Sequence, residues 1–179
     1  MPVEKAAYKV LIKEGNFEVR FYEPMIIVTT AESDIKGYSG FNKLFNYISG
    51  KNRESKKIAM TAPVINQLEG EQKTTAFVMP KAYNLKDLPQ PMDTELHLKE
   101  IRERKVAALI FSGNINPLKI EQKKQELTAW LSEKQITTAG SFELARYNPP
   151  FVPGFIKRNE ILVAVIIPAE LENSLTPPV

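Results

Sequence analysis

The chain is predicted to run twice through the same order of structural elements: strand, helix, strand, strand. In the first half, Phe17, Val19 and Phe21 alternate with polar residues, which is the period of a half-buried strand. The other elements expected in this half lie at 26–30, 41–48, 57–64 and 75–79. Those expected in the second half lie at 96–99, 106–111, 116–134, 142–147 and 161–167. Two structurally similar units therefore make up the chain.

Each helix is predicted from its apolar spacing and its ends. Phe41, Leu44, Phe45 and Ile48 fall at i, i+3, i+4 and i+7, and Gly50 follows as a stop signal. The second helix starts with a cap and a first-position proline, continues to about residue 134, and has an apolar line that is expected to face inward. The residues concerned are Asn116, Pro117, Ile120, Leu127, Trp130 and Leu131.

No linker separates the halves, because the connection at 83–94 has an ordinary length for a crossover. With 179 residues, 43% of them hydrophobic, the chain can bury a substantial core. We expect one domain over residues 1–179, with a core at about 8–167 and a flexible tail at 168–179. The predicted fold class is α+β, a pseudo-twofold arrangement around a mostly antiparallel sheet.

Composition removes several kinds of chemistry. The chain has no cysteine, which excludes disulfides, thiolate zinc sites, Fe–S clusters and a cysteine nucleophile. Its single histidine, His97, excludes multi-histidine metal sites. The lack of cysteine also fits a reducing compartment, so we expect a cytoplasmic location.

The charged residues do not indicate a nucleic-acid partner. The net charge is +3, and lysines and arginines are interleaved with acidic residues along most of the chain. The longest apolar run, 161–167, is ended by Pro168 and is too short to span a membrane. We therefore expect no nucleic acid and no membrane span, and the sequence predicts no particular protein partner.

Several strings along the chain resemble the SOUL/haem-binding protein family. They cover nearly the whole length from about Tyr8 to Ile167, and they occur in the order of the family. The strings are Gly15-Asn16-Phe17-Glu18-Val19-Arg20-Phe21-Tyr22, Tyr47-Ile48-Ser49-Gly50-Lys51-Asn52, Lys57-Ile58-Ala59-Met60-Thr61-Ala62-Pro63-Val64, Phe77-Val78-Met79-Pro80, Phe111-Ser112-Gly113, Tyr147-Asn148-Pro149-Pro150 and Arg158-Asn159-Glu160. The resemblance implies a distorted antiparallel β-barrel of two pseudo-symmetric halves, each with an outer helix, similar to the effector-binding domains of bacterial regulators.

The same resemblance implies a site for haem or another tetrapyrrole, with an apolar platform on the first helix and on the loop before the last strand. The residues implied are Phe41, Leu44, Phe45, Phe151, Val152 and Phe155. Tyr38 borders the platform, while Lys43 and Lys157 are the nearby cations for the ligand carboxylates. For the helix residues, ordinary core packing stays open as the alternative. For the two loop aromatics, a ligand or partner contact is the alternative to burial.

The chain departs from the family pattern at its polar positions. The basic residues that flank haem in relatives align here with Tyr38, Asn46 and Val152, and a histidine of some members is Phe21. We expect His97 to face solvent and assign no metal ligand and no catalytic residue. Tyr38 and Tyr47 either ligate ferric iron as phenolates or are hydrogen-bonded at a rim.

Three further motifs receive structural interpretations. The string at 57–64 is assigned to strand pairing and a bend at Pro63. Arg158-Asn159-Glu160 is expected to form a buried polar network that holds the last strand. The basic run of Lys51, Arg53, Lys56 and Lys57 is either a solvated turn or an anion-facing rim.

The sequence therefore favours non-enzymatic, non-covalent binding of haem or a related tetrapyrrole, as a carrier, buffer or sensor. One alternative is an effector-binding or protein-interaction module for a different small apolar ligand. The other is an enzyme that acts on a tetrapyrrole.

Overall fold

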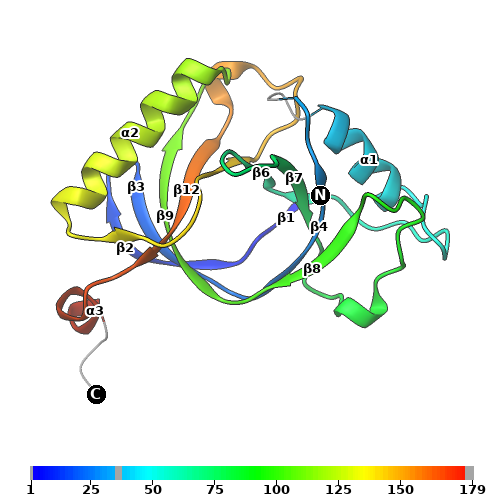
Figure 1. Ribbon diagram of the computed structural model, residues 1–179, viewed down its shortest axis with the longest axis horizontal. Helices are drawn as coiled ribbons and strands as arrows, with labels where there is room; N and C mark the ends of the chain where they lie inside the picture. The colour runs from blue at the N-terminus through cyan, green and yellow to red at the C-terminus, as the bar shows by residue number, and fades with distance from the viewer. Residues whose placement is uncertain (1, 35–37, 176–179) are drawn as a thin grey trace.

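The computed structural model describes residues 2–34 and 38–175, and its main feature is one strongly curled antiparallel sheet with helices on its outside (Figure 1). The helices are α1 (Tyr38–Ile48), α2 (Pro117–Glu133) and α3 (Ala169–Leu175), with 3₁₀ turns η1 (Leu85–Asp87) and η2 (Gly154–Ile156). The strands are β1 (Glu4–Lys5), β2 (Tyr8–Glu14), β3 (Phe17–Tyr22), β4 (Met25–Ala31), β5 (Thr61–Ala62), β6 (Val64–Gln67), β7 (Thr74–Val78), β8 (His97–Ile101), β9 (Arg104–Phe111), β10 (Thr137–Thr138), β11 (Glu143–Arg146) and β12 (Asn159–Ile166).

The predicted repeat is present in the sheet. The order of strands is β2-β3-β9-β12-β11-β6-β7-β4-β8, with β10 attached to β12. The units β4-α1-β6-β7 and β9-α2-β11-β12 correspond, since β4 pairs β7 as β9 pairs β12, and each helix packs on those two strands. The α+β fold with two similar halves is therefore confirmed, and the barrel stays open between β2 and β8.

The halves are interlocked by strands that pass from one to the other. The chain runs almost directly from β3 into β4 and from β8 into β9, while β3 pairs β9 and β4 pairs β8. At the centre, β6 of the first half pairs β11 of the second. Along the lower edge of Figure 1 these ribbons sweep from the α2 side to the α1 side without a break.

Two separate cores lie between the sheet and its outer helices. Ile120, Leu127, Trp130 and Leu131 of α2 are buried against β3, β9 and β12, as their spacing predicts. Leu44, Tyr47 and Ile48 of α1 are buried against β4 and β7. The opposite, concave face of the sheet carries a third, smaller cluster around Tyr22, Val106 and Leu162.

Some predicted boundaries are wrong. The expected strand at 57–64 is β strand only at its end, where Pro63, after a cis peptide bond, separates β5 from β6. Residues 57–60 pair with no strand, because Ile58 N donates instead to the carbonyl of Ile48 at the end of α1 (2.8 Å). Of the tail that was expected to be flexible, 169–175 form α3, and 176–179 lie outside the described residues. Within the described ranges, no helix is long and apolar enough to cross a membrane.

Candidate functional site

The face of α1 that points away from the sheet carries aromatic side chains. Tyr38 is 51% exposed and Phe45 48%, whereas Leu44 is fully buried and Ile48 nearly so. The apolar residues predicted for one face of the helix therefore have two different environments. Leu44 and Ile48 are buried and anchor the helix, whereas Phe45 faces solvent. Leu44, although predicted for the platform, has no exposed surface to offer a ligand.

Tyr38, Phe41 and Phe45 form what we call the aromatic step. Phe41 is half-buried and packs edge-on against Phe77 in the core, with ring centroids 5.1 Å apart. On its other side Phe41 stacks on Phe45, with centroids 6.0 Å apart and planes inclined by 10°. A flat aromatic ligand that lies on Phe45 would extend this stack, and each such ring contact contributes about 0.5–1.5 kcal/mol beyond area burial.

The start of α1 is held by a buried carboxylate from the end of the preceding strand. Glu32 accepts hydrogen bonds from Ser39 Oγ (2.5 Å), Gly40 N (2.8 Å) and Thr75 Oγ1 (2.8 Å). Burial works to raise the pKa of Glu32, but these hydrogen bonds outweigh it and hold the pKa below its ordinary value. An anion at a helix N-terminus is also favoured by the helix dipole, so Glu32 fixes the position of Tyr38 and of the step.

Lys43, the cation that the sequence assigns to the platform, lies on the other side of α1 from Phe45. At 100° per residue, Lys43 lies roughly 160° around α1 from Phe45. Its ammonium group pairs with Glu95 of the segment before β8, and this hydrogen bond raises the pKa of Lys43. To bind a ligand carboxylate on the step, Lys43 would have to leave Glu95.

Arg146, the last residue of β11, is a cation that the sequence did not indicate for the site. Burial lowers the pKa of Arg146, and the carboxylate of Glu32 acts in the opposite direction. No sequence signal marks this residue, because its position depends on how β11 pairs with β6 across the two halves.

The predicted loop residues lie on a separate part of the surface. Phe151 and Phe155 are highly exposed, while Val152 and Lys157 are half-buried. Gly113 N donates to the carbonyl of Gly154 (2.8 Å), which ties η2 to the segment that leads into α2. In Figure 1 the loop after β11 crosses the top of the molecule and η2 lies beside the start of α2, across from α1. Among the described residues, no ring contact joins these two aromatics to the step.

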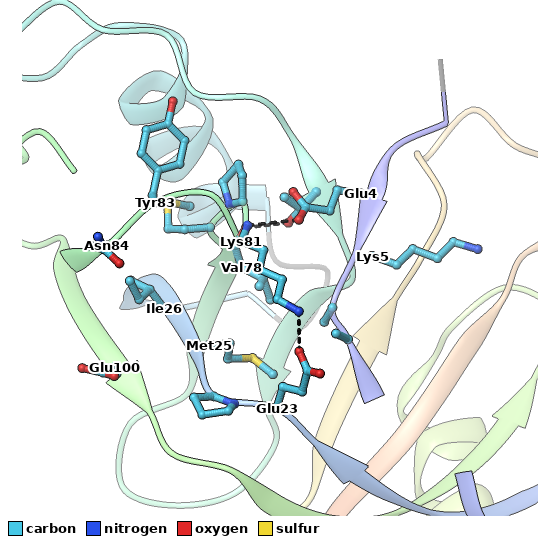
Figure 2. Close-up of a pocket in the computed structure, with 16 residues that line it drawn as sticks. Glu4, Lys5, Glu23, Met25, Ile26, Val78, Lys81, Tyr83, Asn84 and Glu100 are labelled. Carbon is cyan, nitrogen blue, oxygen red and sulfur yellow. Dashed lines mark hydrogen bonds and ion pairs between the residues drawn. The ribbon is translucent and has the colours of Figure 1, made fainter. Parts of the chain in front are cut away.

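Two small cavities lie among the described residues. The first, of about 200 Å³, lies at the concave face near β4 and β7 and is lined by Met25, Val78 and Tyr83 (Figure 2). At its mouth Lys81 Nζ donates to Glu23 (2.7 Å). The second, of about 160 Å³, lies between β6 and the first turns of α2. Since drug-sized ligands occupy pockets of about 300–1,000 Å³, neither cavity can enclose a tetrapyrrole.

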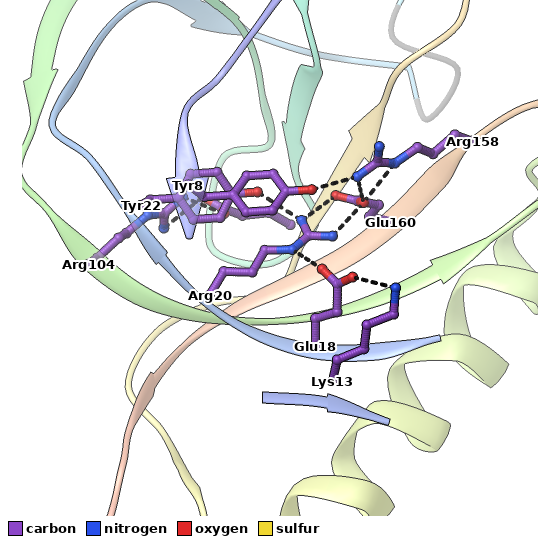
Figure 3. Close-up of polar contacts among 9 residues, drawn as sticks. Tyr8, Lys13, Glu18, Arg20, Tyr22, Arg104, Arg158 and Glu160 are labelled. Atoms are coloured by element: carbon purple, nitrogen blue, oxygen red, sulfur yellow. Dashed lines mark hydrogen bonds and ion pairs between the residues drawn. The ribbon is translucent and has the colours of Figure 1, made fainter. Parts of the chain in front are cut away.

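A buried ionic network lies on the concave face of the sheet (Figure 3). Arg20 donates in a bidentate manner to both carboxylate oxygens of Glu160, each at 2.7 Å, and its Nε donates to Glu18 (2.6 Å). Arg158 donates to Glu160 (2.7 Å) and to the hydroxyl of Tyr8 (2.9 Å). The network expected around 158–160 is therefore confirmed, with Arg20 as the partner that the sequence could not identify.

The remaining candidate ligands for iron are placed as follows. His97 is exposed on β8, as expected. Tyr47 is buried, its hydroxyl donates to the carbonyl of Pro89 (2.7 Å), and burial raises its pKa to about 12, which disfavours the phenolate. In the part of the chain that the structure describes, no group of three or more histidine or carboxylate residues is arranged to hold a metal ion.

The comparisons with known proteins agree with this architecture. Residues 3–164 match the sequence family described as SOUL heme-binding protein. Heme-binding protein 2 of Mus musculus is 28% identical over 162 residues, which cover 84% of this chain and 79% of that protein. Heme-binding protein 2 of Homo sapiens is 29% identical over 147 residues, with 76% and 72% covered.

Solved structures share the fold at much lower identity. The C-terminal domain of EcmrR gives a TM-score of 0.62 at 12% identity, with 90% of this chain and 99% of that chain covered. A structure described as a hydrolase from Listeria innocua gives 0.61 at 10% identity, with 87% and 94% covered. These likenesses extend to the fold alone.

Proposed function

Because the chain belongs to the SOUL heme-binding protein family, we propose that it binds haem or a related tetrapyrrole reversibly on the aromatic step of α1. The observation that carries this proposal is the stacked pair Phe41–Phe45, which leads from the core to a ring that is half exposed. The small volume of both cavities supports a site on the surface over an enclosed one. Binding of this kind is stoichiometric and suits a carrier, buffer or sensor.

The residues around the step fit the porphyrin ring better than they fit the iron. Phe41 and Phe45 supply an apolar aromatic surface, and the phenol of Tyr38 is the only side-chain oxygen donor in the step. The one imidazole of the chain, His97, is exposed on β8, outside the step. The proposal therefore assigns the affinity to ring stacking, and it includes no catalytic residue.

A haemin titration followed by absorbance in the Soret region tests the proposal, with a metal-free porphyrin run beside it. We expect one-to-one saturation by both compounds with affinities within a few-fold of each other. Phe45→Asp should weaken binding at least about tenfold, because it places a charge in the stack. His97→Ala is the matched control and should change nothing. Unchanged binding by Phe45→Asp, with a native circular dichroism spectrum, would move the site away from α1.

A second candidate is a flat apolar ligand without carboxylates, and the pairing of Lys43 with Glu95 favours it. Such a ligand would need no cation at the step. Competition between a dicarboxylate porphyrin and its dimethyl ester separates the two candidates. Tighter binding of the ester would support the neutral ligand, and tighter binding of the free acid would support a natural tetrapyrrole.

A further inference from the structure

One end of the molecule carries a second exposed apolar surface, distinct from the aromatic step. Its members, which we call the apolar tip, are Leu118, Phe151, Phe155 and Ile156, with 70%, 86%, 79% and 59% of their surfaces exposed. Leu118 lies in the first turn of α2, and the other three lie on the loop between β11 and β12. The bond from Gly113 N to the Gly154 carbonyl joins the two segments. Apolar side chains gathered and exposed to this extent mark an interaction surface.

The loop that bears the tip is restricted by its prolines and by hydrogen bonds of its own. Three prolines, at 149, 150 and 153, restrict its φ angles. The N–H groups of Val152, Ile156 and Lys157 donate to carbonyls three residues earlier in the loop (3.1–3.2 Å). Arg158 N donates to the side-chain oxygen of Asn148 (2.6 Å). Because the conformation of the loop is already restricted, docking requires little ordering.

Positive charge lies beside the apolar residues of the tip. Lys119 follows Leu118 in α2, and Lys157 follows Ile156 in the loop. The other cations of these two segments have acidic partners elsewhere, since Lys105 pairs with Glu172 and Arg158 with Glu160. Lys119 and Lys157 are therefore the cations that flank the tip.

We propose that the apolar tip docks this protein peripherally on an anionic lipid bilayer. Phe151 and Phe155 insert at the boundary between headgroups and acyl chains, and Lys157 lies against the anionic headgroups. A bilayer fits these observations because four highly exposed apolar side chains at one end of the molecule lie beside Lys119 and Lys157, which is the combination that an anionic headgroup layer binds. This inference goes beyond tetrapyrrole binding and uses different residues.

Co-sedimentation with vesicles tests this inference on the ligand-free full chain. The vesicles are phosphatidylcholine with and without about 30% phosphatidylserine. We expect the anionic vesicles to bind at least about tenfold more protein, and the difference to shrink as salt is raised. Phe155→Ser and Phe151→Ser should each lower partitioning about tenfold, and Lys157→Gln about fivefold on anionic vesicles only. Met92→Ser removes an exposed apolar side chain elsewhere, 60% accessible, and is the control.

Three outcomes would overturn docking by the tip. The first is the absence of binding to anionic vesicles. The second is an equal loss of vesicle binding for Met92→Ser and Phe155→Ser. The third is a concentration-dependent dimer that Phe155→Ser abolishes, which would assign the tip to self-association. Phe45→Ser separates this inference from the proposed function. It should lose haemin binding and keep vesicle binding, whereas Leu118→Ser, which lies outside every residue assigned to haem, should do the reverse.

Discussion

At the scale of single residues, the most demanding feature is the charge buried inside the sheet. Arg20 and Glu160 are both completely buried, so each depends on the other for compensation of a large desolvation cost. Burial alone would raise the pKa of Glu160, but the hydrogen bonds and charges of Arg20 and Arg158 outweigh it and hold the pKa below its ordinary value. The network connects β3 to β12, which are both neighbours of β9 in the sheet.

We therefore expect acid to destabilise the protein through Glu160. Because its pKa in the folded state lies below the unfolded value of about 4.3, its contribution is complete above that value and is lost as the pH falls towards the folded pKa. Urea unfolding between neutral pH and pH of about 3 measures this loss. Glu160→Gln should cost about 3 kcal/mol at neutral pH, since Arg20 would lose its bidentate partner, and should flatten the acid dependence. Glu121→Gln, on the exposed face of α2, is the control; equal stability of the two variants would contradict the prediction.

Lys43 gives a second prediction at this scale. Its ammonium group already pairs with Glu95, and helix geometry places it away from Phe45. Lys43→Gln should therefore leave haemin affinity within about twofold of the wild-type value and have little effect on stability, because exposed ion pairs contribute little. The measurement is the Soret titration. A large loss of affinity would show that Lys43 leaves Glu95 to hold the ligand.

At the scale of the element, the start of α1 is fixed by its neighbours. Gly40 is buried where the helix meets Glu32, and a Cβ atom at this position would overlap the Glu32 carboxylate and approach Thr75 to 3.0 Å. Position 40 therefore requires glycine because Glu32 and Thr75 approach its Cα atom closely, and not because of its backbone angles. This contact explains why a helix with no acidic residue in its own first turn still begins at Tyr38.

Gly40→Ala should accordingly destabilise the protein by about 1–3 kcal/mol, the usual cost of overpacking. Because the substitution displaces the carboxylate that positions the step, haemin affinity should fall with it. Gly140→Ala is a matched control, since its new methyl group would meet Ala164 at an ordinary 3.5 Å. Thermal unfolding and the Soret titration measure the two effects. If Gly40→Ala changed neither the stability nor the haemin affinity, Glu32 would have room to move, which would contradict this prediction.

At the scale of the whole molecule, the two halves have separate cores but a single sheet. The strands that cross between the halves, and the central pairing of β6 with β11, mean that neither half can keep its sheet without the other. This topology makes the protein one cooperative unit in spite of its two helix-covered cores.

Unfolding should therefore be a single transition. The one tryptophan, Trp130, is buried in the α2 core and stacks on Phe17 with centroids 5.1 Å apart, so its fluorescence reports on the second half. Far-ultraviolet circular dichroism reports on the whole sheet. The midpoints from the two probes in urea should coincide, whereas an earlier fluorescence transition would show that the halves unfold separately.

The sequence alone determined what depends on neighbours along the chain. Both long helices follow from local periodicity and caps: Asn116 accepts from Lys119 N (2.9 Å), as its place before Pro117 predicts. The repeated element order and the family resemblance then led to the correct fold class. Strand β2 was missed because its residues do not alternate cleanly and a bulge interrupts its pairing between Val10 and Ile12.

Only the tertiary structure decided which residues of those elements are accessible and what they face. Helical periodicity places Phe45 and Leu44 on the same apolar face. The contact of α1 with β4 and β7 buries Leu44 but leaves Phe45 exposed. The pairing of Arg20 with Glu160 joins residues 140 positions apart, and strand pairing between the halves brings Arg146 under the electrostatic influence of Glu32. The candidate site depends on such long-range contacts because exposure and charge pairing are set by elements distant in sequence, while helices and turns are set locally.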